Sequence, residues 1–128
     1  MLMFTKTILL AIVLLGFFKS DTIERTQKKQ FVYILRYSDE FKKQIRFGEK
    51  EQATVREHLE YLRGLMNDGN CYFAGRTNNF FDSTLFGVIV FDAASLETAR
   101  ETMNNDPMIK NAIMKGELYP FSVVLIKH

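Results

Sequence analysis

The feature that most constrains this 128-residue chain is an amphipathic stripe that ends at a glycine and is followed directly by a strand pattern. Val55, Leu59, Leu62 and Met66 follow one another at spacings of three and four residues, which places them on one face of an α-helix. Gly69 follows the last of them, where helices commonly end in the left-handed conformation that glycine tolerates best. The sequence therefore predicts a helix that buries this stripe and stops at Gly69.

His58 lies one position away from the stripe, at the edge of the predicted buried face. A histidine at such an edge can contact both the core and the solvent. The other histidine, His128, is the last residue, so His58 is the one histidine expected inside the folded body. The strand that follows the glycine is expected over residues 71–75.

Three further segments are typical of β-strands, because they are rich in β-branched and aromatic residues. They are residues 30–37, 85–91 and 119–126. A second helix is predicted to begin after Ser95, a favourable N-cap, and to end before the Asp106–Pro107 pair, since the residue before a proline disfavours helical angles. The order strand-helix-strand-strand-helix-strand predicts an α+β, ferredoxin-like fold: a four-stranded antiparallel sheet with two helices on one face.

The strands are largely apolar on both of their faces, whereas the helices cover only one face of the sheet. Contiguous apolar patches larger than a few hundred Å² mark interfaces. Burying apolar surface contributes about 25 cal/mol per Å², so a covered sheet face is a large stabilising contribution. We therefore expect a homodimer, in which the sheet of a second copy packs on the open face.

The N-terminal segment differs from the rest of the chain. Residues 7–18 are an uninterrupted, mostly apolar run, which has the length of a signal-peptide core and is short for a membrane span of roughly twenty residues. We interpret residues 1–20 as a signal peptide or an uncleaved N-terminal anchor, residues 21–30 as a polar tether, and residues 31–128 as the domain. The protein is expected to be exported, periplasmic or secreted, with membrane contact only through the first segment if that segment is retained.

The formal net charge of +2 belongs to this first segment and not to the domain. Lys6 and Lys19 lie within it, so 15 of the 17 basic residues remain, against 15 acidic ones. The basic doublets that remain, such as Lys28–Lys29, are isolated and are not interleaved with aromatic residues. Nucleic-acid binding is therefore not expected.

Cysteine and histidine are too few and too widely spaced to predict a metal or redox site. Cys71, the single cysteine, cannot form an internal disulfide and lies in a strand pattern, so we interpret it as a small buried apolar residue and not as a nucleophile. Cys71, His58 and His128 do not have the spacing of metal ligands. No metal and no cofactor is expected.

Two loops contain apolar residues that loops usually lack. Residues 39–50 form a charged connection whose apolar side chains either stay in a mobile loop or fold partly over the core. Residues 76–84 are rich in turn-forming residues, yet they include Phe80 and Phe81. These two rings either plug the edge of the core or line a pocket, and the sequence favours neither.

Four motifs stand in a specific order along the chain: Glu57-His58-Leu59 with Leu62 in the first helix, Gly69 before a strand ending in Ala74-Gly75, Asp106-Pro107 after the second helix, and Pro120-Phe121 at the last strand. With these motifs, the chain from Phe31 to Lys127 resembles the YCII-related family of dimeric α/β-barrel domains. The resemblance implies that His58 and Asp106 form a catalytic pair in a pocket. Arg76 is a departure, because the family usually has a proline there.

A histidine paired with a carboxylate can move a proton at neutral pH, since the carboxylate fixes the tautomer and stabilises the imidazolium. This chemistry suits elimination or isomerisation of a cyclic or aromatic substrate, with Arg76 holding an anionic or phenolic oxygen and Phe80 bordering the cleft. The resemblance implies dehydrochlorination as a further possibility. The alternative is that His58 and Asp106 only tie two helices together. Likewise, the domain is either a small-molecule enzyme or a non-catalytic small-molecule-binding or accessory domain of the cell envelope.

Overall fold

The computed structural model describes residues 28–128. The predicted leader at residues 1–20 and most of the tether at residues 21–30 lie outside the described residues. Within residues 28–128, no helix is long and apolar enough to span a bilayer.

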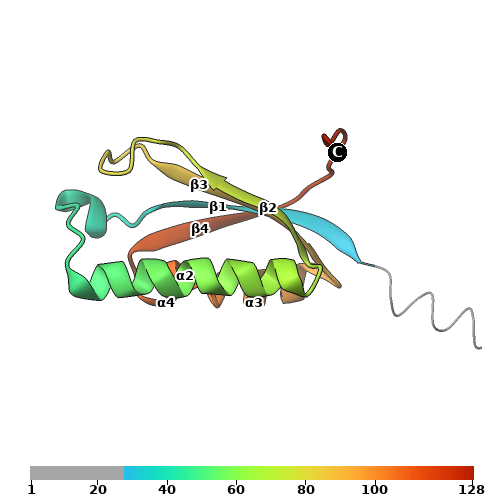
Figure 1. Ribbon diagram of the computed structural model, residues 1–128, viewed down its shortest axis with the longest axis horizontal. Coiled ribbons are helices and arrows are strands. Elements are labelled where there is room, and N and C mark those ends of the chain that lie inside the picture. Colours follow the sequence, from blue (N-terminus) through green and yellow to red (C-terminus); the bar gives the residue numbers. More distant parts are fainter. Residues whose placement is uncertain (1–27) are drawn as a thin grey trace, which may run out of the picture.

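A four-stranded antiparallel sheet forms the centre of the domain, as the sequence predicts (Figure 1). Its strands lie in the order β2-β3-β1-β4, with bounds β1 Lys29–Tyr37, β2 Cys71–Arg76, β3 Phe86–Ala93 and β4 Met114–Pro120. β1 pairs antiparallel with both β3 and β4, and β2 pairs antiparallel with the other side of β3. This order confirms the predicted ferredoxin-like α+β fold.

The helices lie together on one face of the sheet (Figure 1). They are α2 Glu49–Asn67, α3 Leu96–Asn104 and the short α4 Pro107–Lys110, and a 3-10 helix, η1 Phe41–Lys43, precedes α2. α4 contacts both α2 and α3, so it connects the two longer helices. The sequence analysis does not predict α4, because one helical turn is too short to show a hydrophobic period.

The core lies between the sheet and the helices. Alternate residues of the two central strands supply much of it: Phe31, Tyr33, Leu35, Tyr37, Ile89 and Phe91. The connection before α2 folds over one end of this core, where Phe41, Ile45 and Phe47 are partly buried against it. Of the two alternatives for residues 39–50, partial folding over the core is the one that the structure confirms.

The end of α2 is the one that the sequence predicts. Gly69 has a φ of 74°, the left-handed conformation expected just after a helix. The N–H of Asn70 donates to the carbonyl of Leu65 at 2.9 Å, and the N–H of Gly69 donates to the carbonyl of Met66 at 3.0 Å. These two bonds form a Schellman motif, which turns the chain directly into β2.

The face of α2 that the sequence predicts to be buried differs by part of a turn from the face that is buried in the structure. Leu62 is buried, but Leu59 and Met66 are 43% and 41% exposed. The face that points toward the core combines the apolar Val55, Leu62 and Leu65 with polar side chains, each of which has a hydrogen-bond partner elsewhere in the domain: Thr54, His58 and Tyr61. A hydrophobic period cannot locate such a face, because buried polar groups are tolerated once they are hydrogen-bonded.

Ser95 caps α3 as predicted, and its Oγ accepts the N–H of Thr98 at 3.1 Å. The helix ends at Asn104, ahead of the Asp106–Pro107 pair. The same pair then begins α4, with Asp106 as N-cap and Pro107 in the first turn, which is where proline is tolerated in a helix.

The predicted position of the last strand is wrong. The strand was expected over residues 119–126, but β4 spans Met114–Pro120, and residues 121–128 lie outside the sheet. β4 is an edge strand with outward polar residues such as Lys115 and Glu117, so it is less apolar than the run that follows it. Gly116 allows α3 to pack closely on β4, because a Cβ at this position would lie 2.7 Å from the Sδ of Met103.

Candidate active site

The carboxylate of Asp106 is the fixed point of the site. Asp106 caps α4, and its side chain is fully buried. Oδ1 lies 2.8 Å from Nδ1 of His58 and accepts the N–H of Met108 at 3.0 Å, while Oδ2 accepts the hydroxyl of Tyr33 at 2.7 Å. Hydrogen bonds thus hold both carboxylate oxygens, and they come from β1, from α2 and from the backbone of α4.

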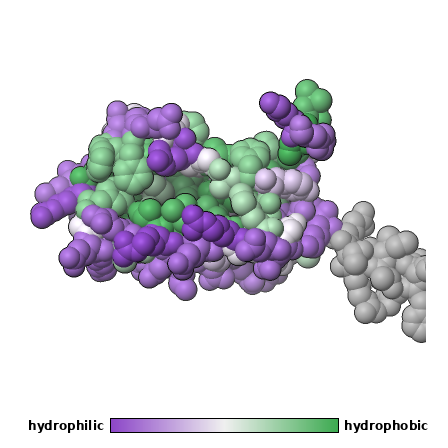
Figure 2. Space-filling view, in the orientation of Figure 1, coloured by the Kyte–Doolittle hydropathy of each residue, from purple (hydrophilic) through white to green (hydrophobic). Residues whose placement is uncertain are grey.

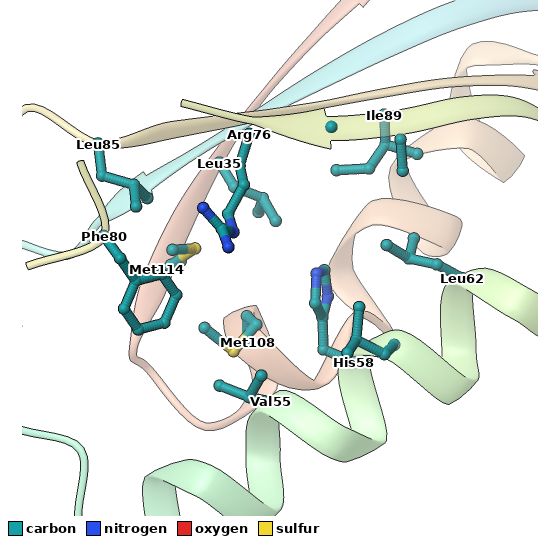
Figure 3. Close-up of a pocket in the computed structure, with 14 residues that line it drawn as sticks. Leu35, Val55, His58, Leu62, Arg76, Phe80, Leu85, Ile89, Met108 and Met114 are labelled. Atoms are coloured by element: carbon teal, nitrogen blue, oxygen red, sulfur yellow. The ribbon is translucent and has the colours of Figure 1, made fainter. Parts of the chain in front are cut away.

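These contacts determine which nitrogen of the His58 ring carries the proton. A carboxylate only accepts hydrogen bonds, so Nδ1 carries the proton in the contact with Asp106. In the neutral ring, Nε2 is then the nitrogen without a proton. The side chain is 16% exposed and lines a pocket, and Figure 3 shows the ring extending from α2 into that pocket. A tautomer fixed in this way makes Nε2 a proton acceptor toward a bound molecule.

The pocket has a volume of about 490 Å³ and lies between α2 and the strands. Figure 2 shows it as an apolar hollow above the polar outer side of α2. Its walls are mostly aliphatic and methionine side chains, among them Leu35, Leu62, Leu85, Ile89, Met108 and Met114. Among the described residues that line it, His58 and Arg76 are the side chains that can carry charge. This lining suits a small, largely apolar molecule with few polar groups.

Arg76 and Phe80 lie on the other side of the pocket from His58 (Figure 3). Arg76 ends β2, and its guanidinium carbon lies 5.2 Å from the centre of the Phe80 ring. The hydroxyl of Tyr37 donates to the carbonyl of Phe80 and so fixes the loop that carries this ring. Within residues 28–128, no carboxylate lies within ion-pair distance of Arg76. Its positive charge is therefore available to an anion in the pocket.

Three of the four predicted site residues line one pocket: His58, and opposite it Arg76 and Phe80. The fourth, Asp106, is fully buried behind His58 and in direct contact with it. Both alternatives hold for Phe80, which packs against the core and lines the pocket. Phe81 is instead 71% exposed and packs edge-on against Phe80.

Tyr33 is the site residue that the sequence analysis does not find. The sequence feature that could have indicated it is a tyrosine on the apolar face of a central strand, because a buried tyrosine hydroxyl usually has a hydrogen-bond partner. Burial, followed by the negative charge of Asp106 and the hydrogen bond to it, raises the pKa of Tyr33 far above its usual range. Tyr33 therefore remains a protonated donor at any physiological pH.

Cys71 lies outside this pocket and is half-buried at the edge of the core. Burial raises the pKa of its thiol, partly offset by a contact with the carbonyl of Phe73. A raised pKa makes the thiol a poorer nucleophile at neutral pH. Among residues 28–128, no group of three or more His, Cys, Asp or Glu side chains is arranged to hold a metal ion.

A sequence model of the YCII-related domain matches residues 30–122, a stretch that contains all four site residues and nearly the whole described fold. This chain belongs to the YCII-related domain family. No curated protein matches it. The identity of the family thus comes from the domain sequence, and it agrees with the strand order described above.

Solved structures that resemble this YCII-related domain include the following two. One is 5-chloro-2-hydroxyhydroquinone dehydrochlorinase (TftG) from Burkholderia phenoliruptrix AC1100 in complex with 2,5-dihydroxybenzoquinone, with 17% identity, 72% of this chain and 93% of that chain covered, and a TM-score of 0.51. The other is the uncharacterized protein TM1266 from Thermotoga maritima, with 10% identity, 75% of this chain and 100% of that chain covered, and a TM-score of 0.49. At such identities the likeness concerns the fold alone.

Proposed function

We propose that this protein is a small-molecule enzyme in which His58 transfers a proton to and from a cyclic or aromatic substrate. One observation carries the proposal: Nδ1 of His58 is bound to the fully buried carboxylate of Asp106, while the ring lines an apolar pocket. Asp106 holds the tautomer and stabilises the imidazolium that forms when Nε2 accepts a proton. Catalysis of this kind needs the acceptor atom within hydrogen-bond reach of the proton that it removes.

The pocket also limits the class of substrate. Its apolar walls favour a small ring. The guanidinium of Arg76, which donates to the carbonyl of Thr77 but has no ion-pair partner within residues 28–128, favours an anionic or phenolic oxygen on that ring. A substrate oriented by Arg76 at one side presents its opposite edge to His58 (Figure 3). Small hydroxylated or keto-substituted rings meet both conditions.

Two reactions fit this arrangement. In an isomerisation, Nε2 removes a proton from the carbon beside a carbonyl, the electron pair delocalises onto the carbonyl oxygen near Arg76, and the imidazolium returns the proton to another carbon. In a dehydrochlorination, the substrate reacts as its keto tautomer, in which the carbon that bears chlorine also carries a hydrogen. Nε2 removes the proton of a ring hydroxyl, the electron pair of that O–H bond forms a new carbonyl and shifts a ring double bond toward the chlorinated carbon, and chloride leaves with the electron pair of the carbon–chlorine bond, so the net loss is HCl. The structural similarity to a dehydrochlorinase makes a chlorinated hydroquinone the first compound to test.

The test is turnover of 5-chloro-2-hydroxyhydroquinone and of cyclic enones, followed by chloride release and ultraviolet absorbance. We expect His58→Ala to abolish turnover, and His128→Ala, the other histidine, to have no effect. Arg76→Met should raise KM about tenfold or more, the loss expected for one charge-assisted hydrogen bond. Arg36→Met is the matched control, because Arg36 lies 5.2 Å from the Phe86 ring but outside the pocket. Equal turnover in wild type and His58→Ala would contradict the proposal.

A non-catalytic binding domain is the second candidate. The observation that favours it is that, among the described residues lining the pocket, His58 is the one side chain suited to proton transfer at neutral pH, so no second acid or base faces it. This candidate predicts saturable binding of a ring-shaped anion that depends on Arg76, with no turnover. A crystal soaked with small aromatic and keto acids would reveal the bound group beside His58.

We also propose that the protein works as an exported homodimer, joined through the sheet face opposite the helices. Tyr119 on that face is 47% exposed, and in the segment after β4 the side chains of Val124 and Leu125 are 85% and 92% exposed. A second copy would cover these apolar side chains, whereas the described part of one chain does not. Export rests on the apolar run at residues 7–18, and contact with a membrane requires that this run be retained.

A further inference from the structure

Tyr33 holds Asp106 from the side opposite His58. The two side chains lie 73 residues apart in sequence, on β1 and at the start of α4, and both are fully buried. Tyr33 does not line the pocket, so a bound molecule contacts His58 and not Tyr33. Any effect of Tyr33 on the reaction must therefore pass through the carboxylate.

The two oxygens of the Asp106 carboxylate accept hydrogen bonds from different donors. Oδ1 accepts hydrogen bonds from His58 and from the N–H of Met108, whereas Tyr33 is the one donor to Oδ2 within residues 28–128. Without the tyrosine hydroxyl, Oδ2 would be a buried acceptor without a partner, which is a costly arrangement. The carboxylate would then be free to rotate about its last bond and exchange its two oxygens between the remaining donors.

The tyrosine ring is itself held in place. Its plane meets the Phe91 ring at 73°, with the ring centres 5.5 Å apart, which is the edge-to-face geometry that aromatic pairs prefer. The central strand β1 and the inner side of β3 therefore determine where the hydroxyl points. Because burial and the adjacent carboxylate raise the pKa of Tyr33, the hydroxyl stays a donor and does not take over the negative charge.

We propose that Tyr33 is a positioning residue: by binding Oδ2 of Asp106 it keeps Oδ1 on Nδ1 of His58 and so keeps Nε2 as the proton acceptor in the pocket. The proposal rests on the proposed function insofar as it concerns the reaction. Its structural part, the fixed tautomer of His58, is independent of whether any substrate is turned over.

The test compares Tyr33→Phe with Tyr61→Phe. Both variants remove one hydroxyl that donates at 2.7 Å, but the Tyr61 hydroxyl binds the carbonyl of Thr102 and not Asp106. The readout is the imidazole nitrogen spectrum of His58 in ¹⁵N-labelled protein, together with the exchange rate of its Nδ1 proton with water. His128→Ala identifies the His58 signals, because the chain has two histidines.

We expect one tautomer in the wild type and in Tyr61→Phe. In Tyr33→Phe we expect nitrogen shifts between those of the two tautomers and proton exchange about tenfold faster, the factor that one ordinary hydrogen bond produces. If the wild type turns over a substrate, kcat should fall about tenfold in Tyr33→Phe while KM stays within about twofold, because the groups that bind the substrate are unchanged.

Unchanged His58 signals in a folded Tyr33→Phe variant would overturn the proposal, and so would mixed tautomers in the wild type. If Tyr33→Phe does not fold, Phe91→Leu serves instead, since it removes the ring that orients Tyr33 and leaves the hydroxyl in place. It should accelerate exchange of the Nδ1 proton by a smaller factor, and an unchanged rate would likewise overturn the proposal. A wild type without turnover but with the single tautomer would refute the proposed function and leave the role of Tyr33 standing.

Discussion

The two faces of the β-sheet differ in how completely the described residues bury the apolar side chains on them. On the inner face, α2, α3 and α4 cover the strands, and no buried side-chain nitrogen or oxygen within residues 28–128 lacks a hydrogen-bond partner. On the outer face, Val32 and Val90 are buried, but Phe86 and Tyr119 are 36% and 47% exposed. The inner face is thus a closed core that contains a polar site, whereas apolar side chains on the outer face are partly exposed in the described part of the chain.

This difference shows that apolar residues on both sides of a strand do not imply one kind of partner. The inner side of β1 packs on helices of its own chain, and the site is built where a carboxylate enters that core. The outer side carries the exposed ion pair between Arg36 and Glu117 beside its apolar centre, with the two side chains 45% and 43% exposed. Such a mixture of apolar centre and polar rim is common in interfaces between proteins.

The largest expected effect on stability concerns the carboxylate on the inner face. Asp106→Ala should lower the free energy of unfolding by about 3 kcal/mol or more, since three donors lose their buried acceptor and α4 loses its cap. Asp92→Ala is the matched control on the outer side of β3, where the carboxylate only accepts the Tyr72 hydroxyl, and it should cost about 1 kcal/mol or less. Urea denaturation measures both, and equal losses would remove the distinction between the faces.

The second effect concerns the outer face. Val88→Asp places a charge on β3, and we expect it to weaken the proposed dimer at least about a hundredfold, since an unpaired charge at an interface costs several kcal/mol. Val124→Asp should weaken the dimer without unfolding the monomer, because Val124 is 85% exposed. Leu96→Asp is the control on the helical side, where the side chain is 46% exposed. Light scattering on residues 21–128 gives the mass, and a wild-type monomer at micromolar concentration would refute the barrel.

The sequence predicts the order of the elements well, because each long element carries a local signal. The left-handed Gly69 and the Ser95 cap lie at the predicted ends of two helices. The family resemblance implies the contact between His58 and Asp106, and the fold permits it, since the helices lie on one face of the sheet. These features depend on residues that are close in sequence or on the topology as a whole.

Other features depend on partners far apart in sequence, and local patterns do not reveal them. His58 can point inward because the carboxylate of Asp106 accepts a hydrogen bond from its ring, and the buried Asp106 carboxylate in turn accepts a hydrogen bond from the Tyr33 hydroxyl. The edge strand β4 contains several polar residues, whereas the run after it is more apolar. A hydrophobic pattern therefore places the predicted strand over that run and not over β4. The roles of His58, Asp106, Arg76 and Phe80 in a reaction stay predictions.

The third effect compares a glycine that is closely packed on the inner face with a glycine that has free space around it. Gly116→Ala should cost about 1–2 kcal/mol, because the new methyl group would lie 2.7 Å from the Sδ of Met103 and 2.8 Å from the Cδ1 of Ile109. Gly64→Ala, on the exposed side of α2 with no atom within 4 Å of the new Cβ, should instead stabilise by about 0.5–1 kcal/mol. Denaturation midpoints measure both, and a stabilising effect of Gly116→Ala would show that the side chains of Met103 and Ile109 make room for the new methyl group.

The smallest effect lies at the rim where the two faces meet. Cys71 begins the edge strand β2 and is half-buried at the margin of the core. Burial raises the pKa of its thiol, so at a given pH a smaller fraction is thiolate than in a free cysteine, and the thiolate is the reactive form. Iodoacetamide should therefore modify Cys71 several-fold more slowly than it modifies free cysteine at pH 7.5. The rate should keep rising with pH beyond the range where free cysteine has levelled off. Modification as fast as that of the free amino acid would mean that this edge of the inner face opens to solvent.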